Sequence, residues 1–97
     1  MKNTKTFPCS DLGNAERFAK EWGAKFYISE SGKTWYHRGH RIASETEIYQ
    51  AATTTVRKLL VDAKNQKEID FALKSQNLVS IRNMLKLAKS EPEFARH

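Results

Sequence analysis

A change in the spacing of apolar side chains between residues 24 and 43 is the feature that most constrains the fold. On both sides of this segment, apolar residues recur every three or four positions, which is typical of amphipathic helices. Inside it, two short segments rich in aromatic and β-branched side chains, 25–28 and 34–37, flank Ser31 and Gly32. Two such segments around a glycine-containing turn predict a β-hairpin.

A second turn, at Arg38 and Gly39, follows the hairpin and allows residues 40–42 to form a short third strand. Glycine favours turn and cap positions because it tolerates positive φ. We therefore expect positive φ at Gly23, Gly32 and Gly39.

Four helices are predicted around the hairpin, and two of them have clear start signals. The first has Ser10 or Asp11 as its N-cap. The second opens at a capping box, in which the side chains of Ser44 and Glu47 can each accept a hydrogen bond from the other residue's backbone N–H. Apolar periodicity predicts helices over about 11–22, 45–63, 69–73 and 78–88.

These signals predict an α+β fold, a small single domain in which a β-hairpin of two or three short strands packs on about four α-helices. A length of 97 residues allows one domain, 1–97, and we expect its core to span about 7–95. The hydrophobic share of 39% is enough for a small core. No run approaches the roughly 18 apolar residues of a membrane span, and the N-terminus lacks the apolar region of a secretory signal.

Cys9 is the only cysteine in the sequence. An internal disulfide and a cysteine-based zinc site are therefore excluded, which fits a reducing compartment and a cytoplasmic location. No base stands next to Cys9 in the sequence, so we expect a half-buried, inert thiol rather than a nucleophile.

The net charge of +6, from 17 Lys and Arg against 11 Asp and Glu, has two interpretations. It favours an anionic partner, most often nucleic acid. It is also within the range that simply keeps a small domain soluble. The distribution of charge along the chain favours the first interpretation, because the segment 33–41 holds five basic or imidazole side chains and no acid.

We predict that this segment contacts nucleic acid, because lysine and arginine neutralise phosphates and an aromatic ring can stack on an unpaired base. Alternation along a strand places Trp35 in the core and Tyr36 on the opposite face. The predicted nucleic-acid-binding residues are Lys33, Tyr36, Arg38, His40 and Arg41.

A second basic set lies on the polar faces of the predicted helices, where Asp62, Glu68 and Asp70 are interspersed with it. Such mixed charge is more typical of a solvated surface than of a binding site. The set consists of Arg57, Lys58, Lys64, Arg82, Lys86 and Lys89.

Catalytic and cofactor sites are not predicted. The segment 32–34 has the ending of a phosphate-binding loop, but Tyr27 stands where that motif needs its first glycine, and a hairpin turn is the better interpretation. His37 and His40 offer only two of the four ligands that zinc prefers, so we expect no metal and no other cofactor. The first helix spreads its carboxylates instead of pairing them for acid–base catalysis, namely those of Asp11, Glu16 and Glu21.

Two stretches carry a family resemblance. The sequence Ser10-Asp11-Leu12-Gly13-Asn14-Ala15-Glu16-Arg17-Phe18, followed by an aromatic hairpin, resembles the opening of the N-terminal accessory domain of phage, plasmid and poxvirus primase–helicases. Ser75 and the later stretch Met84-Leu85-Lys86-Leu87-Ala88-Lys89-Ser90-Glu91-Pro92 resemble the close of the same domain. The likeness spans roughly residues 7–95, and in that family the domain precedes a superfamily-three helicase ATPase.

The resemblance implies a non-catalytic accessory domain of a mobile-element DNA primase–helicase, which contributes to DNA engagement or to assembly in replication. DNA is then the expected partner, together with helicase or primase domains. The chain departs from the family pattern in two places, since Arg38 precedes Gly39 where an acid is frequent and Ile42 stands where a later aromatic falls.

An alternative from another class stays open. A free-standing small protein of a phage or mobile element could use the same basic surface to bind and inhibit a host replication or defence complex. The sequence does not choose between DNA and RNA, and it does not fix the oligomeric state or the protein partner.

Overall fold

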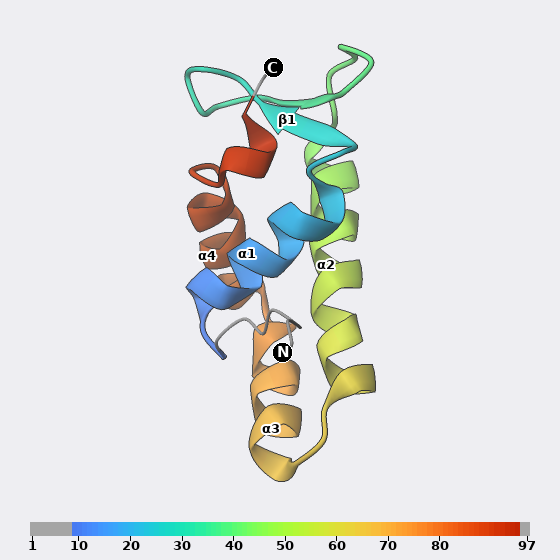
Figure 1. Ribbon diagram of the computed structural model, residues 1–97, viewed down its shortest axis with the longest axis vertical. Helices are drawn as coiled ribbons and strands as arrows, with labels where there is room; N and C mark the ends of the chain where they lie inside the picture. The colour runs from blue at the N-terminus through green and yellow to red at the C-terminus, as the bar shows by residue number, and fades with distance from the viewer. Residues whose placement is uncertain (1–8, 96–97) are drawn as a thin grey trace, which may run out of the picture.

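The computed structural model describes residues 9–95 and confirms an α+β domain with four helices and a two-stranded antiparallel sheet. In Figure 1 the hairpin covers one end of the helices, α1 crosses between α2 and α4, and α3 lies at the far end. The elements, in chain order, are α1 Asp11–Trp22, β1 Phe26–Ile28, β2 Trp35–His37, α2 Glu45–Asp62, α3 Gln66–Ser75, α4 Leu78–Ala88 and a 3-10 turn, η1, Pro92–Phe94.

Side-chain caps define where the helices begin. The Ser10 hydroxyl accepts a hydrogen bond from the Gly13 N–H at 3.0 Å, which starts α1. Both bonds of the predicted capping box are present, with Ser44 and Glu47 bonded reciprocally at 3.1 Å. Helices α3 and α4 each begin at an asparagine whose side chain accepts from a backbone N–H three residues later, Asn65 and Asn77. These caps satisfy backbone donors that the first helical turn leaves unpaired.

Three aromatic rings join the hairpin to the helices. The Trp35 ring meets the Phe94 ring edge-on at a centroid distance of 4.9 Å, and the Phe18 ring lies 6.2 Å from Trp35 and 5.2 Å from Phe94. Phe18 and Phe94 are fully buried. The 3-10 turn after α4 is therefore part of the core, and it fixes the position of β2 against α1.

The hairpin has the predicted turn and the predicted alternation. Its register pairs Tyr27 with Tyr36 and Ile28 with Trp35. Trp35 belongs to the main core cluster, whereas Tyr36 is half-buried on the other face. The expected third strand is reduced to a single bridge between Tyr36 and Ile42.

Positive φ occurs at Gly32, where it is 74°, as the turn requires. The prediction is wrong for Gly23, which has a helical φ of −59°. It is also wrong for Gly39, because the left-handed residue of the second turn is His40, with φ of 69°. Position 23 requires glycine for a different reason, since a Cβ there would lie 2.6 Å from the Cβ of Glu93.

Cys9 is exposed, so the expectation of a half-buried thiol is wrong. It sits just before the N-cap of α1, outside the packed helices. Across residues 9–95, none of the helices combines the length and the apolar character needed to cross a bilayer.

Candidate nucleic-acid interface

Tyr27 organises the outer face of the hairpin. It is only 4% exposed, although it lies outside the main core cluster. The Tyr36 ring stacks on it, with centroids 5.2 Å apart and planes 13° apart. The His40 ring meets it edge-on, and the Tyr27 hydroxyl lies 3.0 Å from His40 Nδ1. The predicted site residues Tyr36 and His40 are thus brought together by a tyrosine that the sequence analysis did not single out.

Arg38 connects the base of the hairpin to the ends of α1 and η1. Its Nε and Nη2 both donate to the Gly23 carbonyl, at 3.1 and 2.9 Å. Nη2 also donates to Glu93 O at 2.8 Å, and Nη1 donates to Ala95 O at 3.1 Å. These bonds use most of the five N–H donors of the guanidinium. The guanidinium carbon also lies 5.4 Å from the centre of the Tyr27 ring. Arg38 therefore holds three chain segments together.

Arg41 is the more accessible arginine of the segment, with 68% of its side chain exposed. Its Nη1 lies 3.7 Å from Glu47 Oε1, while His37 Nε2 lies 2.8 Å from Glu47 Oε2. The hydrogen bond from the Ser44 N–H, followed by the contacts with His37 and Arg41, lowers the pKa of Glu47. One carboxylate at the start of α2 therefore anchors the end of β2 and leaves Arg41 at the surface.

Lys33 extends from the hairpin loop. The Ser29 hydroxyl accepts from the N–H groups of Lys33 and Thr34, at 3.3 and 3.1 Å, and the Gly32 N–H donates to the Ser29 carbonyl at 2.9 Å. The loop backbone is thus bonded to itself, and the Lys33 side chain is exposed. The segment 32–34 lies between two strands, so the predicted hairpin turn is confirmed.

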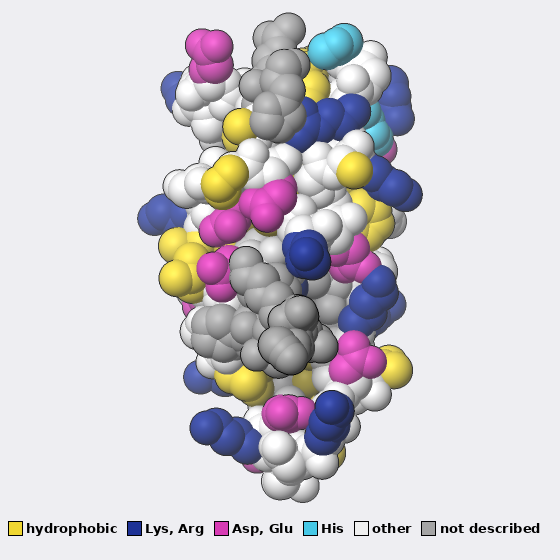
Figure 2. All heavy atoms as spheres, viewed as in Figure 1, with side chains coloured by type: hydrophobic (Ala, Val, Ile, Leu, Met, Phe, Trp, Pro, Cys, Tyr) yellow, Lys and Arg dark blue, Asp and Glu magenta, His cyan; other side chains and the backbone are white. Residues whose placement is uncertain are grey.

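Figure 2 shows basic and imidazole side chains at the hairpin end of the molecule, with an acid at its margin. Along the helices, by contrast, Lys and Arg alternate with Asp and Glu over the same face. Lys58, from the second basic set, is ion-paired with Glu21. Within residues 9–95, no group of three or more His, Cys, Asp or Glu side chains is arranged to hold a metal ion.

Sequence reasoning missed two parts of this surface. The sequence gives a weak signal that Tyr36 covers Tyr27, because paired residues of two strands lie on the same face of the hairpin. The role of Arg38 had none, since its acceptors are backbone carbonyls up to 57 residues away in sequence. Every residue carries a backbone carbonyl, so the amino-acid sequence does not indicate which carbonyls accept these hydrogen bonds.

The comparisons with known proteins agree with the resemblance. A family model described as "D5 N terminal like" matches residues 15–97, which is most of the chain. No curated protein and no solved structure gives a significant match. The matched region includes the aromatic hairpin, all of α2 to α4 and most of α1. The chain therefore belongs to the D5 N-terminal-like family, the N-terminal domain of D5-like phage and poxvirus primase–helicases.

Proposed function

We propose that this domain engages DNA in replication through the outer face of its hairpin and acts as a non-catalytic accessory module of a primase–helicase. The observation that carries the proposal is the half-buried Tyr36 ring, stacked on Tyr27, in a segment with exposed cations and no acid between residues 31 and 44. Family membership supports the setting, since the relatives of this domain stand in primase–helicases.

The residues have different roles in this proposal. Lys33 and Arg41 contact phosphates, because both side chains are exposed at the hairpin. Tyr36 stacks on a base, with His40 beside it as a hydrogen-bonding or cationic neighbour. Arg38 orients the surface through its three carbonyl partners. Because stacking needs an unpaired base, we expect single-stranded DNA to bind more tightly than duplex DNA.

The test is fluorescence polarisation of labelled single- and double-stranded DNA over a series of salt concentrations. We expect the double variant Lys33→Gln/Arg41→Gln to bind more weakly. Its slope of log affinity against log salt should fall by about 1.4, since each phosphate contact on a single strand contributes about 0.7.

The matched control is Lys67→Gln/Lys86→Gln, which removes the same charge from exposed positions on α3 and α4. We expect it to keep its affinity and its salt slope. Equal losses in the two double variants would mean that only net charge matters, and the hairpin would then be rejected as the interface. Urea unfolding of each variant shows whether the fold is intact.

A second candidate function is favoured by Ile42. This side chain is 62% exposed next to Tyr36, and an apolar group in a basic surface suits an acidic protein partner. In that case the domain would bind a helicase or primase domain, or inhibit a host replication or defence complex. The variant Ile42→Ser separates the two functions, because DNA affinity should not change, whereas binding to such a protein should weaken.

A further inference from the structure

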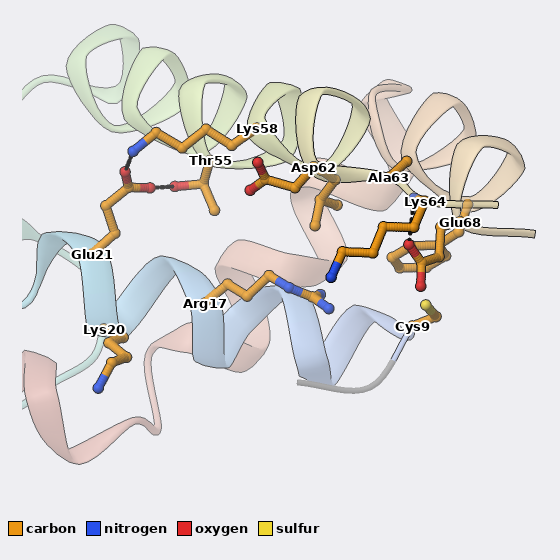
Figure 3. A pocket seen from close by; sticks show the side chains of 12 residues that line it. Cys9, Arg17, Lys20, Glu21, Thr55, Lys58, Asp62, Ala63, Lys64 and Glu68 are labelled. Carbon is orange, nitrogen blue, oxygen red and sulfur yellow. Dashed lines mark hydrogen bonds and ion pairs between the residues drawn. The ribbon is translucent and has the colours of Figure 1, made fainter. Parts of the chain in front are cut away.

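Helix α1 is bonded to each of the other three helices by polar side chains. The bonds join Thr55 and Lys58 of α2 to Glu21, Ser75 of α3 to Asn14, and Asn83 of α4 to Asp11. Figure 3 shows the first two, in which Glu21 lies between Lys58 and Thr55. These bonds identify the side of α2, α3 and α4 that faces α1.

The opposite side of these three helices carries a leucine on each. One residue of an α-helix turns the chain by about 100°, so a side chain two positions from an α1 contact points away from α1. On α2, α3 and α4 in turn, residues at that spacing are Leu60, Leu73 and Leu85. Leu60 is 40% exposed and Leu73 is 54% exposed, whereas Leu85 is partly buried against the core. The three helices contact one another, so these residues form one surface, the leucine face.

Two arginines border the leucine face. Arg57 and Arg82 each stand three positions before a leucine of the face, which makes them its neighbours on the helix surface. Both are exposed. Among residues 9–95, neither guanidinium has a hydrogen bond or an ion pair, and no acid stands three or four positions from either in its helix. Both charges are therefore available to a partner.

The border of the leucine face is mainly positive. Lys89, four positions after Leu85, adds a third exposed cation. One acid, Asp70, stands three positions before Leu73, and it accepts from Gln66 Nε2 at 2.8 Å. A second copy of this chain would therefore bring mainly like charges together, whereas an acidic partner has complementary charge.

We propose that the leucine face docks an amphipathic helix of a protein partner, whose apolar row packs on the leucines and whose acidic side chains pair with Arg57 and Arg82. A helix binds such a surface through apolar residues spaced three and four positions apart. All residues of the face belong to α2, α3 and α4, so the hairpin takes no part in it. The proposal does not depend on the function proposed for the hairpin.

Nuclear magnetic resonance titration of the ¹⁵N-labelled protein with a synthetic peptide tests the proposal. The peptide is a helix of about three heptads, with leucine at the a and d positions and glutamate at e and g. We expect saturable shifts at the amides of Leu60, Leu73 and Leu85, with no shift at Tyr36 or Arg41. A second peptide with lysine in place of each glutamate should bind at least about tenfold more weakly.

The double variant Arg57→Gln/Arg82→Gln tests the charged border. It should weaken binding of the acidic peptide by about tenfold, because two ion pairs are lost. Its matched control is Lys20→Gln/Lys67→Gln, which removes the same charge from exposed positions on α1 and α3. We expect the control to keep its affinity.

The variant Leu73→Ser tests the apolar part of the face. It should also weaken peptide binding by about tenfold, because apolar contact area is lost. Its control is Val79→Ser, since Val79 is 65% exposed but lines a hollow with Asp11, on the α1 side of α4. Urea unfolding shows whether each variant is folded.

The absence of a saturable shift with the acidic peptide, equal affinity for the two peptides, or equal loss in a variant and its control would each overturn the proposal. Shifts of the leucine-face amides on dilution of the protein alone would assign the face to a second copy, and shifts with single-stranded DNA would assign it to nucleic acid. Either result rejects a helical protein partner. Because the hairpin signals are followed in the same spectra, failure of this face is distinguishable from failure of the hairpin interface.

Discussion

The Arg38 guanidinium donates two hydrogen bonds to the carbonyl of Gly23, from Nε at 3.1 Å and from Nη2 at 2.9 Å. Gly23 caps α1, and Arg38 follows β2 directly, so the pair fixes the hairpin to the helix that precedes it. The same guanidinium reaches the carbonyls of Glu93 and Ala95. One side chain therefore sets the geometry at the base of the proposed interface.

The first prediction concerns these two hydrogen bonds from Arg38. Arg38→Lys keeps the charge but cannot form the paired donation, because the lysine ammonium lacks the planar fork. We expect the free energy of unfolding to fall by about 1–3 kcal/mol. Urea unfolding measures it, with Arg57→Lys as the control, since Arg57 is exposed on α2. Equal stability of the two variants would show that the carbonyl bonds contribute nothing.

The second prediction concerns the contact between the end of α1 and η1. In Gly23→Ala, the new Cβ would lie 2.6 Å from Glu93 Cβ and 2.7 Å from Ala19 O, so the backbone must shift. We expect a loss of about 1–3 kcal/mol of stability. Gly39→Ala is the matched control, because nothing lies within 4 Å of its Cβ position. Thermal unfolding should separate the two, and a larger loss in Gly39→Ala would contradict the packing.

The third prediction concerns a partly buried chain of hydrogen bonds between α1 and α2. Trp22 Nε1 donates to Thr55 Oγ1 at 2.9 Å, and the Thr55 hydroxyl donates to Glu21 at 2.6 Å. Thr55→Val removes both bonds and leaves the indole N–H without its acceptor, at a cost of about 1–3 kcal/mol.

The neighbouring Thr54→Val is the control for this chain, because Thr54 is exposed and its hydroxyl donates only along its own helix, to Gln50 O at 2.9 Å. Tryptophan fluorescence during urea unfolding reports both stability and the environment of the indole. Identical midpoints for the two variants would rule out a stabilising role for the chain.

The fourth prediction concerns the stability of the fold at low pH. The hydrogen bond from the Ser44 N–H, with the contacts of His37 and Arg41, lowers the pKa of Glu47 in the folded state. A carboxyl whose pKa is lower folded than unfolded adds stability above its unfolded pKa of about 4.3, and that stability is lost as the pH falls through the folded pKa.

Glu47→Gln should therefore flatten the decline of the melting temperature as the pH is lowered below about 5. Glutamine can still accept from the N-cap N–H, so the helix start is kept. Glu45→Gln, an exposed position in the same turn, serves as the comparison. If the two variants show the same pH profile, the Glu47 contacts do not stabilise the fold.

Local signals made most of the fold predictable. The capping box at Ser44 and the glycine turn at Gly32 are encoded within a few residues, and both are confirmed. The alternation that buries Trp35 and leaves Tyr36 on the outer face is equally local. Each of these features depends on residue type and spacing alone.

The parts that escaped prediction depend on distant segments. Gly23 was assigned positive φ, whereas its real constraint is Glu93, which arrives from the other end of the chain. Arg17 and Lys64 both line a cleft between α1 and the corner of α2 and α3 (Figure 3), and no local pattern in the sequence indicates that these two side chains lie near each other. The proposed site residues stay proposals, because family membership names a domain and not its contacts.

The buried pair of Asn14 and Ser75 has a further consequence. Their hydrogen bond joins α1 to α3 across 61 positions of sequence, inside a core that is otherwise mainly apolar. If α1 slid by one turn along α4, the helix with which it packs most extensively, apolar contacts could re-form with other partners, but Asn14 and Ser75 would both be left buried without a hydrogen-bond partner. The pair thus selects one register of helix packing, because it destabilises shifted arrangements that hydrophobic burial alone would tolerate.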